Sequence, residues 1–184
     1  RKVVEKVNHL GNLSPDGKRV LFVRYGDPAP DTSVNVTNST LISANSENGS
    51  DEQVVRVLEG ESVIRKARFS SDGRSIFYIR RELKEIEYWS IVMLDVQTGS
   101  EREILSKKER IEVLAPLDRN GGLLMNAVDG NSNRRQLFHV AVPSGVVTRI
   151  TNDLNSYIGV SVDREGRNIV SVLRTDESRV WTGN

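Results

Sequence analysis

The 184-residue sequence has no cysteine, and only 5% of its residues are aromatic. The missing cysteine excludes disulfides, thiolate zinc sites and cysteine nucleophiles, but it leaves the redox compartment open. The scarcity of aromatic rings argues against a stacking surface for single-stranded nucleic acid. The net charge is only +1, although 28% of the residues are charged. We therefore expect no nucleic-acid partner and no attraction to an anionic membrane.

Long apolar runs are also missing. No stretch approaches the roughly 20 apolar residues that a membrane-spanning helix needs, so we expect no direct membrane insertion. Residues 1–7 alternate in polarity and lack the apolar segment of a signal peptide. An opening without methionine or a leader suggests a piece of a longer polypeptide.

What the sequence does contain is a repeated turn. Its two clearest copies are Ser14-Pro15-Asp16-Gly17-Lys18 and Ser70-Ser71-Asp72-Gly73-Arg74, and weaker copies end at Gly121 and Gly166. The turn glycines recur about every 45 to 56 residues, and a second glycine phase falls at Gly49, Gly99 and Gly145. Two phases indicate two hairpins, hence four strands, in each unit. Such a unit is typical of one propeller blade.

Each turn lies between runs of strand-forming residues. Asp-Gly and Asn-Gly pairs permit the positive φ angles of tight hairpins, so we expect a structural role for Asp16, Gly17, Asp72, Gly73, Asn120, Gly121 and Gly166. The runs that follow are apolar at consecutive positions, as in 20–23, 76–79 and 169–173. Consecutive apolar residues predict strands covered on both faces, as in stacked blades.

The sequence therefore predicts an all-β fold, a partial β-propeller of about four blades, each a four-stranded antiparallel sheet. We expect residues 2–7 to be the outer strand of a preceding blade, followed by blades over 8–60, 61–108 and 109–152 and an incomplete blade over 153–184. Since sheet edges must be covered, three assemblies fit. They are a small ring closed by the N-terminal strand, a homodimer formed through the incomplete-blade edges, and an open arc of a larger propeller, which we favour.

The turn residues also resemble those of a known family. The segments 14–18 and 70–74 resemble the SPDGK signature of TolB-like, WD-repeat-related β-propellers. Segments 149–159 and 178–181 resemble the propeller region of bacterial eukaryotic-like serine/threonine kinases. This resemblance implies a sensory or protein-interaction module, extracytoplasmic and without activity of its own. Asn120 and Glu165, where the signature has aspartate, depart from it, which puts the detail of those turns in doubt.

No catalytic pattern accompanies the repeats. The two histidines, His9 and His139, lack the carboxylate or serine partners at defined spacings that a catalytic or metal site needs. The turn serines are better explained by hydrogen bonds to the backbone that fix the hairpins. We expect no cofactor, no metal and no enzymatic activity. Trp89 and Trp181 are expected to pack between blades, and the arginines and lysines of 65–84 to form a solvated blade edge.

A binding site, if the chain has one, is expected at the channel mouth, where the inner strands start. The candidate residues there are His9, Arg65, Lys66, Glu112 and Tyr157, and their mixed polarity suits a peptide or a small polar ligand. We therefore expect a non-catalytic module for protein or peptide recognition, the sensory part of a larger bacterial protein. The alternative is a gating propeller in a prolyl-oligopeptidase-like peptidase, which a Gly-x-Ser-x-Gly motif elsewhere in the parent protein would indicate.

Overall fold

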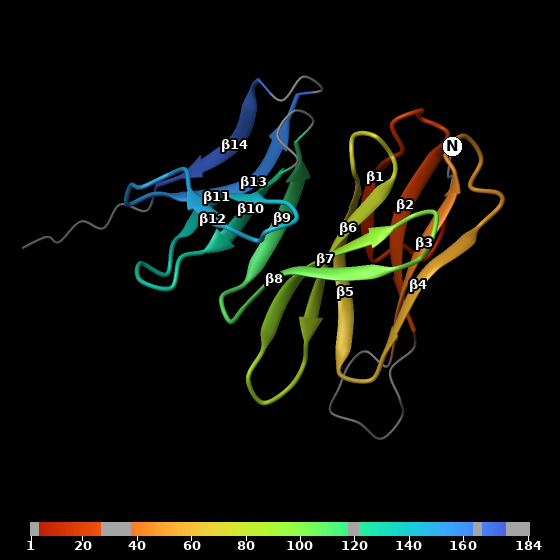
Figure 1. Ribbon diagram of the computed structural model, residues 1–184, viewed down its shortest axis with the longest axis horizontal. Coiled ribbons are helices and arrows are strands. Elements are labelled where there is room, and N and C mark those ends of the chain that lie inside the picture. Colours follow the sequence, from red (N-terminus) through yellow and green to blue (C-terminus); the bar gives the residue numbers. More distant parts are fainter. Residues whose placement is uncertain (1–3, 27–37, 118–121, 164–166, 176–184) are drawn as a thin grey trace, which may run out of the picture.

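The computed structural model describes residues 4–26, 38–117, 122–163 and 167–175, and in these ranges it contains fourteen strands and no helix (Figure 1). The first sheet consists of β1 (His9–Leu13), β2 (Arg19–Tyr25), β3 (Asn38–Asn45) and β4 (Gln53–Glu59). The second consists of β5 (Ser62–Phe69), β6 (Ser75–Glu82), β7 (Tyr88–Asp95) and β8 (Glu101–Lys107). The third consists of β9 (Ile111–Pro116), β10 (Gly122–Val128), β11 (Arg135–Ala141) and β12 (Val147–Arg149).

The fourth sheet contains β13 (Ser156–Val162) and β14 (Ile169–Arg174) in the described residues. Its expected third strand, near residue 180, lies outside the described residues. In every sheet each strand pairs antiparallel with the next strand in the sequence. The predicted all-β fold of about four antiparallel blades is therefore confirmed. No helix capable of crossing a membrane occurs in the described ranges.

The sheets follow one another as an arc. The inner strand of each sheet contacts the inner strand of the next, from β1 to β5, β9 and β13, and no comparable contact returns from β13 to β1 in the described residues. Figure 1 shows the first two sheets on one side and the last two on the other. The described strands thus form an open arc and not a four-bladed ring.

Residues 4–8 do not form the strand expected over 2–7. Lys6 has a φ angle of 52°, which extended backbone does not adopt. Val4 and Val7 instead pack on Phe22 and Ile42 of the first sheet. The described part of this segment covers an apolar face that would otherwise be open to water.

The core lies between the sheets. One cluster joins the first and second sheets, a second joins the second and third, and a smaller one joins the third and fourth. Second strands are buried on both faces, as the consecutive apolar residues of 20–23 and 76–79 predict. The same prediction is wrong for 169–173, because no described sheet covers the outer face of β14. Val170 and Val172 there are 67% and 61% exposed.

The repeated turn is wider than an Asp-Gly hairpin. Ser14 and Arg19 exchange two hydrogen bonds, one from the Ser14 N–H to the Arg19 carbonyl and one from the Arg19 N–H to the Ser14 Oγ, both 2.9 Å long. Gly17 has a φ angle of 73°, whereas Asp16 is not in the positive-φ region. The Asp16 carboxylate instead accepts bonds from the Ser14 hydroxyl and the Lys18 N–H. The positive φ that the Asp-Gly pair predicts is therefore found at the glycine, and the aspartate acts through its carboxylate.

The second sheet repeats this turn bond for bond, from Ser70 to Ser75 around Asp72 and Gly73. In the fourth sheet Asp163 takes the place of the serine, and its side chain accepts from the Arg167 N–H and the Asn168 amide. In the third sheet the described residues keep one hydrogen bond of this turn, from the Leu117 N–H to the Gly122 carbonyl. Asn120, Gly121 and Gly166 lie outside the described residues.

All four inner strands are irregular. Each shifts its register by one residue against the second strand of its sheet, at Arg65 in β5 and Glu112 in β9, and between Leu10 and Leu13 in β1 and Ile158 and Ser161 in β13. An extra residue in one strand increases the local twist and turns neighbouring side chains. These bulges decide which inner-strand side chains reach the middle of the arc.

Candidate functional site

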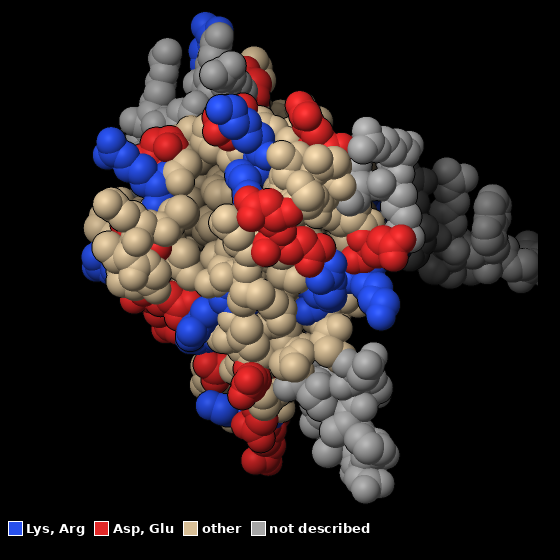
Figure 2. All heavy atoms as spheres, turned by 90° about the vertical axis from the view of Figure 1, so that its right-hand side faces the viewer, with Lys and Arg blue, Asp and Glu red and all other residues tan. Residues whose placement is uncertain are grey.

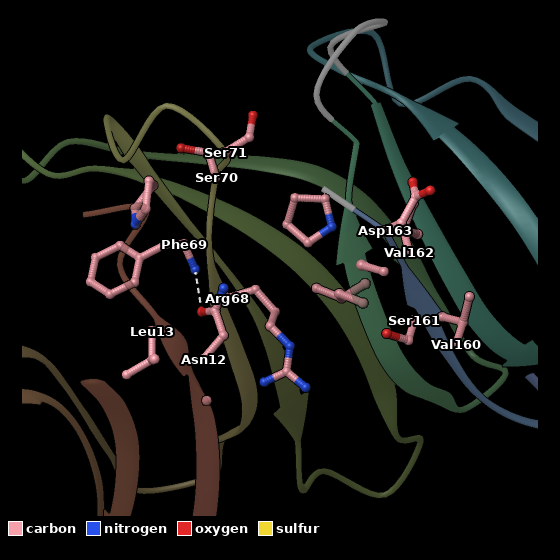
Figure 3. Close-up of a pocket in the computed structure, with 15 residues that line it drawn as sticks. Asn12, Leu13, Arg68, Phe69, Ser70, Ser71, Val160, Ser161, Val162 and Asp163 are labelled. Atoms are coloured by element: carbon pink, nitrogen blue, oxygen red, sulfur yellow. Dashed lines mark hydrogen bonds between the residues drawn. The ribbon is translucent and has the colours of Figure 1, made fainter. Parts of the chain in front are cut away.

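A cavity of about 600 Å³ lies where the four inner strands end (Figure 3). It is lined by residues 11–13 of β1, 68–71 of and after β5, 114–116 of β9 and 160–163 of and after β13, together with Pro15. All four sheets contribute the same part of the repeat. The cavity is therefore built by the arc as a whole and would be lost if any one sheet moved away.

Gly11 allows the first inner strand to approach its neighbours at this point. A Cβ atom on Gly11 would lie 2.7 Å from the Cβ of Leu21 and 3.0 Å from the carbonyl oxygen of Ala67. A side chain at this position would push β1 away from β2 and from the next inner strand, β5. A glycine is therefore needed here for close packing of two sheets.

Asn12 ties the first two sheets together at the wall of the cavity. Its Oδ1 atom accepts a hydrogen bond of 2.8 Å from the Phe69 N–H (Figure 3). The bond joins adjacent inner strands that do not pair as a β-ladder. Without it a half-buried backbone N–H would lack this partner, which is costly in a low-dielectric setting.

Two charged residues line the cavity. Arg68 extends from β5 into the space between Asn12 and Ser161 (Figure 3), and burial lowers the pKa of its guanidinium. Asp163 lies on the opposite side, and hydrogen bonds from the Arg167 N–H and the Asn168 amide lower the pKa of its carboxyl. The lowered pKa favours the ionised form of Asp163, and Arg68 is charged because a guanidinium stays protonated in proteins. Leu114, Ala115, Pro116 and Val160 supply an apolar wall between them.

The turn serine beside this cavity is held by hydrogen bonds within its own turn. Ser70 donates its hydroxyl to Asp72 over 2.7 Å and accepts from the Ser75 N–H over 2.9 Å, which confirms the expected structural role of the turn serines.

No group of three or more histidine, aspartate or glutamate side chains that could hold a metal ion occurs in the described part of the chain. A charged donor, a carboxylate and an apolar wall are what a site for a polar peptide segment requires.

None of the five residues expected at a binding site lines this cavity. Two of them, His9 and Arg65, meet at Tyr25, beside the beginning of the inner strands. The Tyr25 hydroxyl lies 2.9 Å from Nε2 of His9 and 3.2 Å from Nη1 of Arg65, and it donates to the Ile64 carbonyl. Burial, Arg65 and Lys66 lower the pKa of His9 to about 4. His9 is therefore a neutral interface residue at neutral pH.

Glu112 and Tyr157 are committed elsewhere. The Glu112 carboxylate pairs with Arg110 at 3.0 Å and with Arg135 at 3.2 Å. The Tyr157 hydroxyl donates to Asp153, and its ring packs against the apolar cluster between the third and fourth sheets. The structure thus brings His9, Arg65 and Lys66 within electrostatic reach of one another, and Glu112 also acts on Lys66. No such interaction links Tyr157 to them among the described residues.

The basic residues of 65–84 do not form a one-signed surface. Arg80 pairs with Glu82 and Glu103, Arg81 with Glu87, and Lys84 with Glu82. Figure 2 shows acidic and basic side chains interspersed on the side of the molecule that it faces. For Arg80, Arg81 and Lys84, this pairing supports the prediction of a solvated blade edge.

Trp89 packs as predicted, between two blades. It is 4% exposed and belongs to the cluster shared by the second and third sheets. The guanidinium carbons of Arg81 and Arg110 lie over its ring system, 5.3 Å and 5.7 Å from the ring centroid, so this tryptophan is a packing residue of the interface. Trp181 lies outside the described residues.

Arg68 and Asn12 are the cavity residues that sequence reasoning missed. Both stand two residues before the serine that opens the repeated turn, at Ser14 and Ser70. Aligning the repeats on these serines would have shown that this position reaches the middle of the arc. What the alignment could not show is which end of the inner strands is hollow, because the bulges decide that.

Comparison with known proteins shows which fold the chain resembles but identifies no family for it. No family model matches the chain, and no curated protein sequence matches it. Among solved structures, TolB from Acinetobacter baumannii superposes with a TM-score of 0.67 at 16% identity, over 94% of this chain and 39% of that chain.

Two other solved structures are similar in the same way. Puromycin hydrolase superposes with a TM-score of 0.65 at 18% identity, over 94% of this chain and 26% of that one. An oligogalacturonate lyase in complex with manganese superposes with a TM-score of 0.66 at 14% identity, over 90% and 46%. The chain thus spans about a quarter to a half of the length of these structures. They support a TolB-like β-propeller fold.

Proposed function

We propose that this propeller arc is a non-catalytic module that recognises a peptide or a segment of a protein in the cavity between its inner strands. The observation that carries the proposal is the cavity itself, about 600 Å³ and lined by all four sheets. This size falls within the range of ordinary ligand sites, about 300 to 1,000 Å³. The site belongs at the ends of the inner strands, and the cluster around Tyr25 is a structural junction.

The lining fits a peptide better than a compact apolar ligand. The apolar wall of Leu114 and Val160 can bury a side chain, while Arg68 and Asp163 offer charges of opposite sign on either side. The N–H and C=O groups of a bound segment need polar partners wherever they leave water. The exposed hydroxyls of Ser71 and Ser161 at the cavity are available for this purpose.

A gating role in a peptidase is the second candidate. The observation in its favour is the superposition on puromycin hydrolase, a solved structure of which this chain covers 26%. In that case the cavity would admit a substrate peptide toward a catalytic domain elsewhere in the parent protein. A Gly-x-Ser-x-Gly motif in the parent protein would support the gate, and a kinase domain followed by a membrane span would support the sensor.

Selection of peptides by display on the 184-residue chain tests the proposal. A Ser161→Trp substitution places a bulky side chain at an exposed position of the cavity. Because it fills the space, the affinity for the selected peptides is expected to fall at least about 10-fold. Ser144→Trp, on the exposed turn between β11 and β12, is the matched control and is expected to bind as the wild type does. Binding that survives Ser161→Trp unchanged would place the recognition site elsewhere.

The wider setting of this module is part of the same proposal. The family resemblance supports a sensory or interaction role, outside the cytoplasm, in a larger bacterial protein. A homodimer is supported by the exposed apolar side chains of β14, including Val170 and Val172. Light scattering over a range of concentrations checks the dimer, and a constant monomeric mass would rule it out.

A further inference from the structure

The position of Arg68 in the repeat explains why its side chain does not bond to the third sheet as Asn12 bonds to the second. Asn12 and Arg68 are equivalent, since each stands two residues before the serine of its turn. Phe69 and Pro116 are equivalent in the same frame, because the N–H groups of Ser70 and Leu117 make the same turn bond. Asn12 uses its amide oxygen to accept from the Phe69 N–H of the next sheet.

The same bond cannot form between the second and third sheets. Pro116 has no N–H to donate, and a guanidinium has donors only. The interface therefore lacks both partners of the bond that Asn12 makes. The one hydrogen bond of the Arg68 side chain within the described residues runs from Nη1 to the Ala67 carbonyl, over 3.2 Å. A guanidinium has five N–H donors, so most of the donors of this cavity-lining side chain have no partner among the described residues.

The described carboxylates around the cavity do not neutralise this charge. Asp163 is held by the Arg167 N–H and the Asn168 amide, and Glu112 on β9 is paired with Arg110 and Arg135. No ion pair of Arg68 occurs among the described residues. The nearby Lys66 adds a second positive charge on the same strand. Burial, Arg68 and Arg65 lower its pKa, and the smaller influence of Glu112 raises it.

We propose that Arg68 anchors a carboxylate of the peptide that occupies the cavity. This inference rests on the proposed function and names the chemical group that the site selects. The planar guanidinium matches a carboxylate through two parallel N–H bonds. The apolar wall of Ala115, Pro116 and Val160 keeps water from part of the pair, which strengthens the attraction. The carboxylate can belong to a chain terminus or to an aspartate or glutamate side chain.

Three short probes test the anchor and separate the two sources. They are N-acetyl-Leu-Ala-Ala with a free carboxylate, the same peptide as its amide, and N-acetyl-Leu-Asp-Ala amide. Amide chemical shifts of Phe69, Ala115 and Val160 report binding to the 184-residue chain. At least one acidic probe is expected to bind about 10-fold more tightly than the neutral amide. The acidic probe that does so identifies the source of the carboxylate.

Arg68→Gln is expected to remove that preference, and Arg74→Gln, an exposed arginine in the turn of the same sheet, is expected to retain it. Thermal unfolding establishes that each variant is folded. Arg68→Lys keeps the positive charge but loses the planar arrangement of N–H donors, so the affinity for the acidic probe is expected to fall about 3-fold. This variant replaces Arg68→Gln in the test if Arg68→Gln does not fold.

Equal affinity for the acidic and neutral probes, or an unchanged preference for the acidic probe in Arg68→Gln, would show that Arg68 does not anchor a carboxylate. Neither result would contradict the proposed function. No shift at the cavity with any probe at about 10 mM would overturn both.

Discussion

The Oδ1 atom of Asn12 in β1 accepts a hydrogen bond of 2.8 Å from the backbone N–H of Phe69 in β5. The two residues belong to different sheets, and the bond closes the wall of the central cavity between them. The stability of this interface and the shape of the site therefore depend on the same contact. Such coupling is expected where a binding site is built from the meeting of repeats.

Asn12→Ala is expected to lower the free energy of unfolding by about 1 to 2 kcal/mol, because the N–H of Phe69 loses its acceptor in a partly buried place. Chemical denaturation of the purified chain measures the change. Asn131→Ala, at an exposed turn position, is the control and is expected to change stability by no more than about 0.5 kcal/mol. Equal stability of Asn12→Ala and the wild type would show that the bond contributes nothing to the interface.

Gly17 and Gly73 separate backbone strain from crowding. Both have φ near +70°. Alanine at either position must adopt this left-handed conformation, which destabilises the folded chain by about 1 to 2 kcal/mol. A Cβ atom on Gly73 would also lie 3.3 Å from Cδ of Pro15 in the neighbouring turn, whereas one on Gly17 would meet nothing within 4 Å. Gly73→Ala should therefore lower the melting temperature more than Gly17→Ala does. The reverse order would contradict the contact between the two turns.

His9 predicts a pH dependence of stability. Its pKa in the folded chain is about 4, below the ordinary value of 6.5, because burial, Arg65 and Lys66 disfavour the imidazolium. The unfolded chain therefore binds the proton first, and the stabilising contribution is complete above pH 6.5 and is lost as the pH falls toward 4. Partial exposure of the ring reduces the effect to about 1 to 2 kcal/mol.

Urea denaturation of the wild type and of His9→Gln across this pH range measures the contribution. The difference in stability between the two proteins should shrink as the pH falls from 6.5 toward 4. Because other groups titrate in both proteins, the difference isolates His9. A difference that stays constant with pH would show that His9 titrates equally in the folded and unfolded chains.

The sequence predicts the repeat well because each turn is a local structure. Ser14 and Asp16 make their hydrogen bonds within the turn, and the Gly17 N–H donates to the Ser14 carbonyl. The consecutive apolar residues of β2 and β6 likewise report burial on both faces, and that burial is observed. The failure at 169–173 has the same physical origin, since burial of a strand depends on a neighbouring sheet and not on the strand alone.

The site could not be placed from the sequence for a different reason. A one-residue bulge reverses the face that a side chain occupies, and the bulges at Arg65 and Glu112 leave no local signal in residue type. Only Gly11 and Gly159, glycines inside inner strands, hint at the irregularity in the other two sheets. The sequence therefore predicts Arg65 and Glu112 at a channel mouth and carries no signal that Arg68 lines the cavity.

Photo-cross-linking of a selected peptide tests the location of the site most directly. A display-selected peptide that carries a benzophenone side chain is irradiated with the 184-residue chain, and the attached residues are identified by mass spectrometry. We predict attachment within 11–13, 68–71, 114–116 and 160–163, the residues that line the cavity. Attachment at His9, Lys66 or Tyr157, with the cavity residues unmodified, would contradict the account.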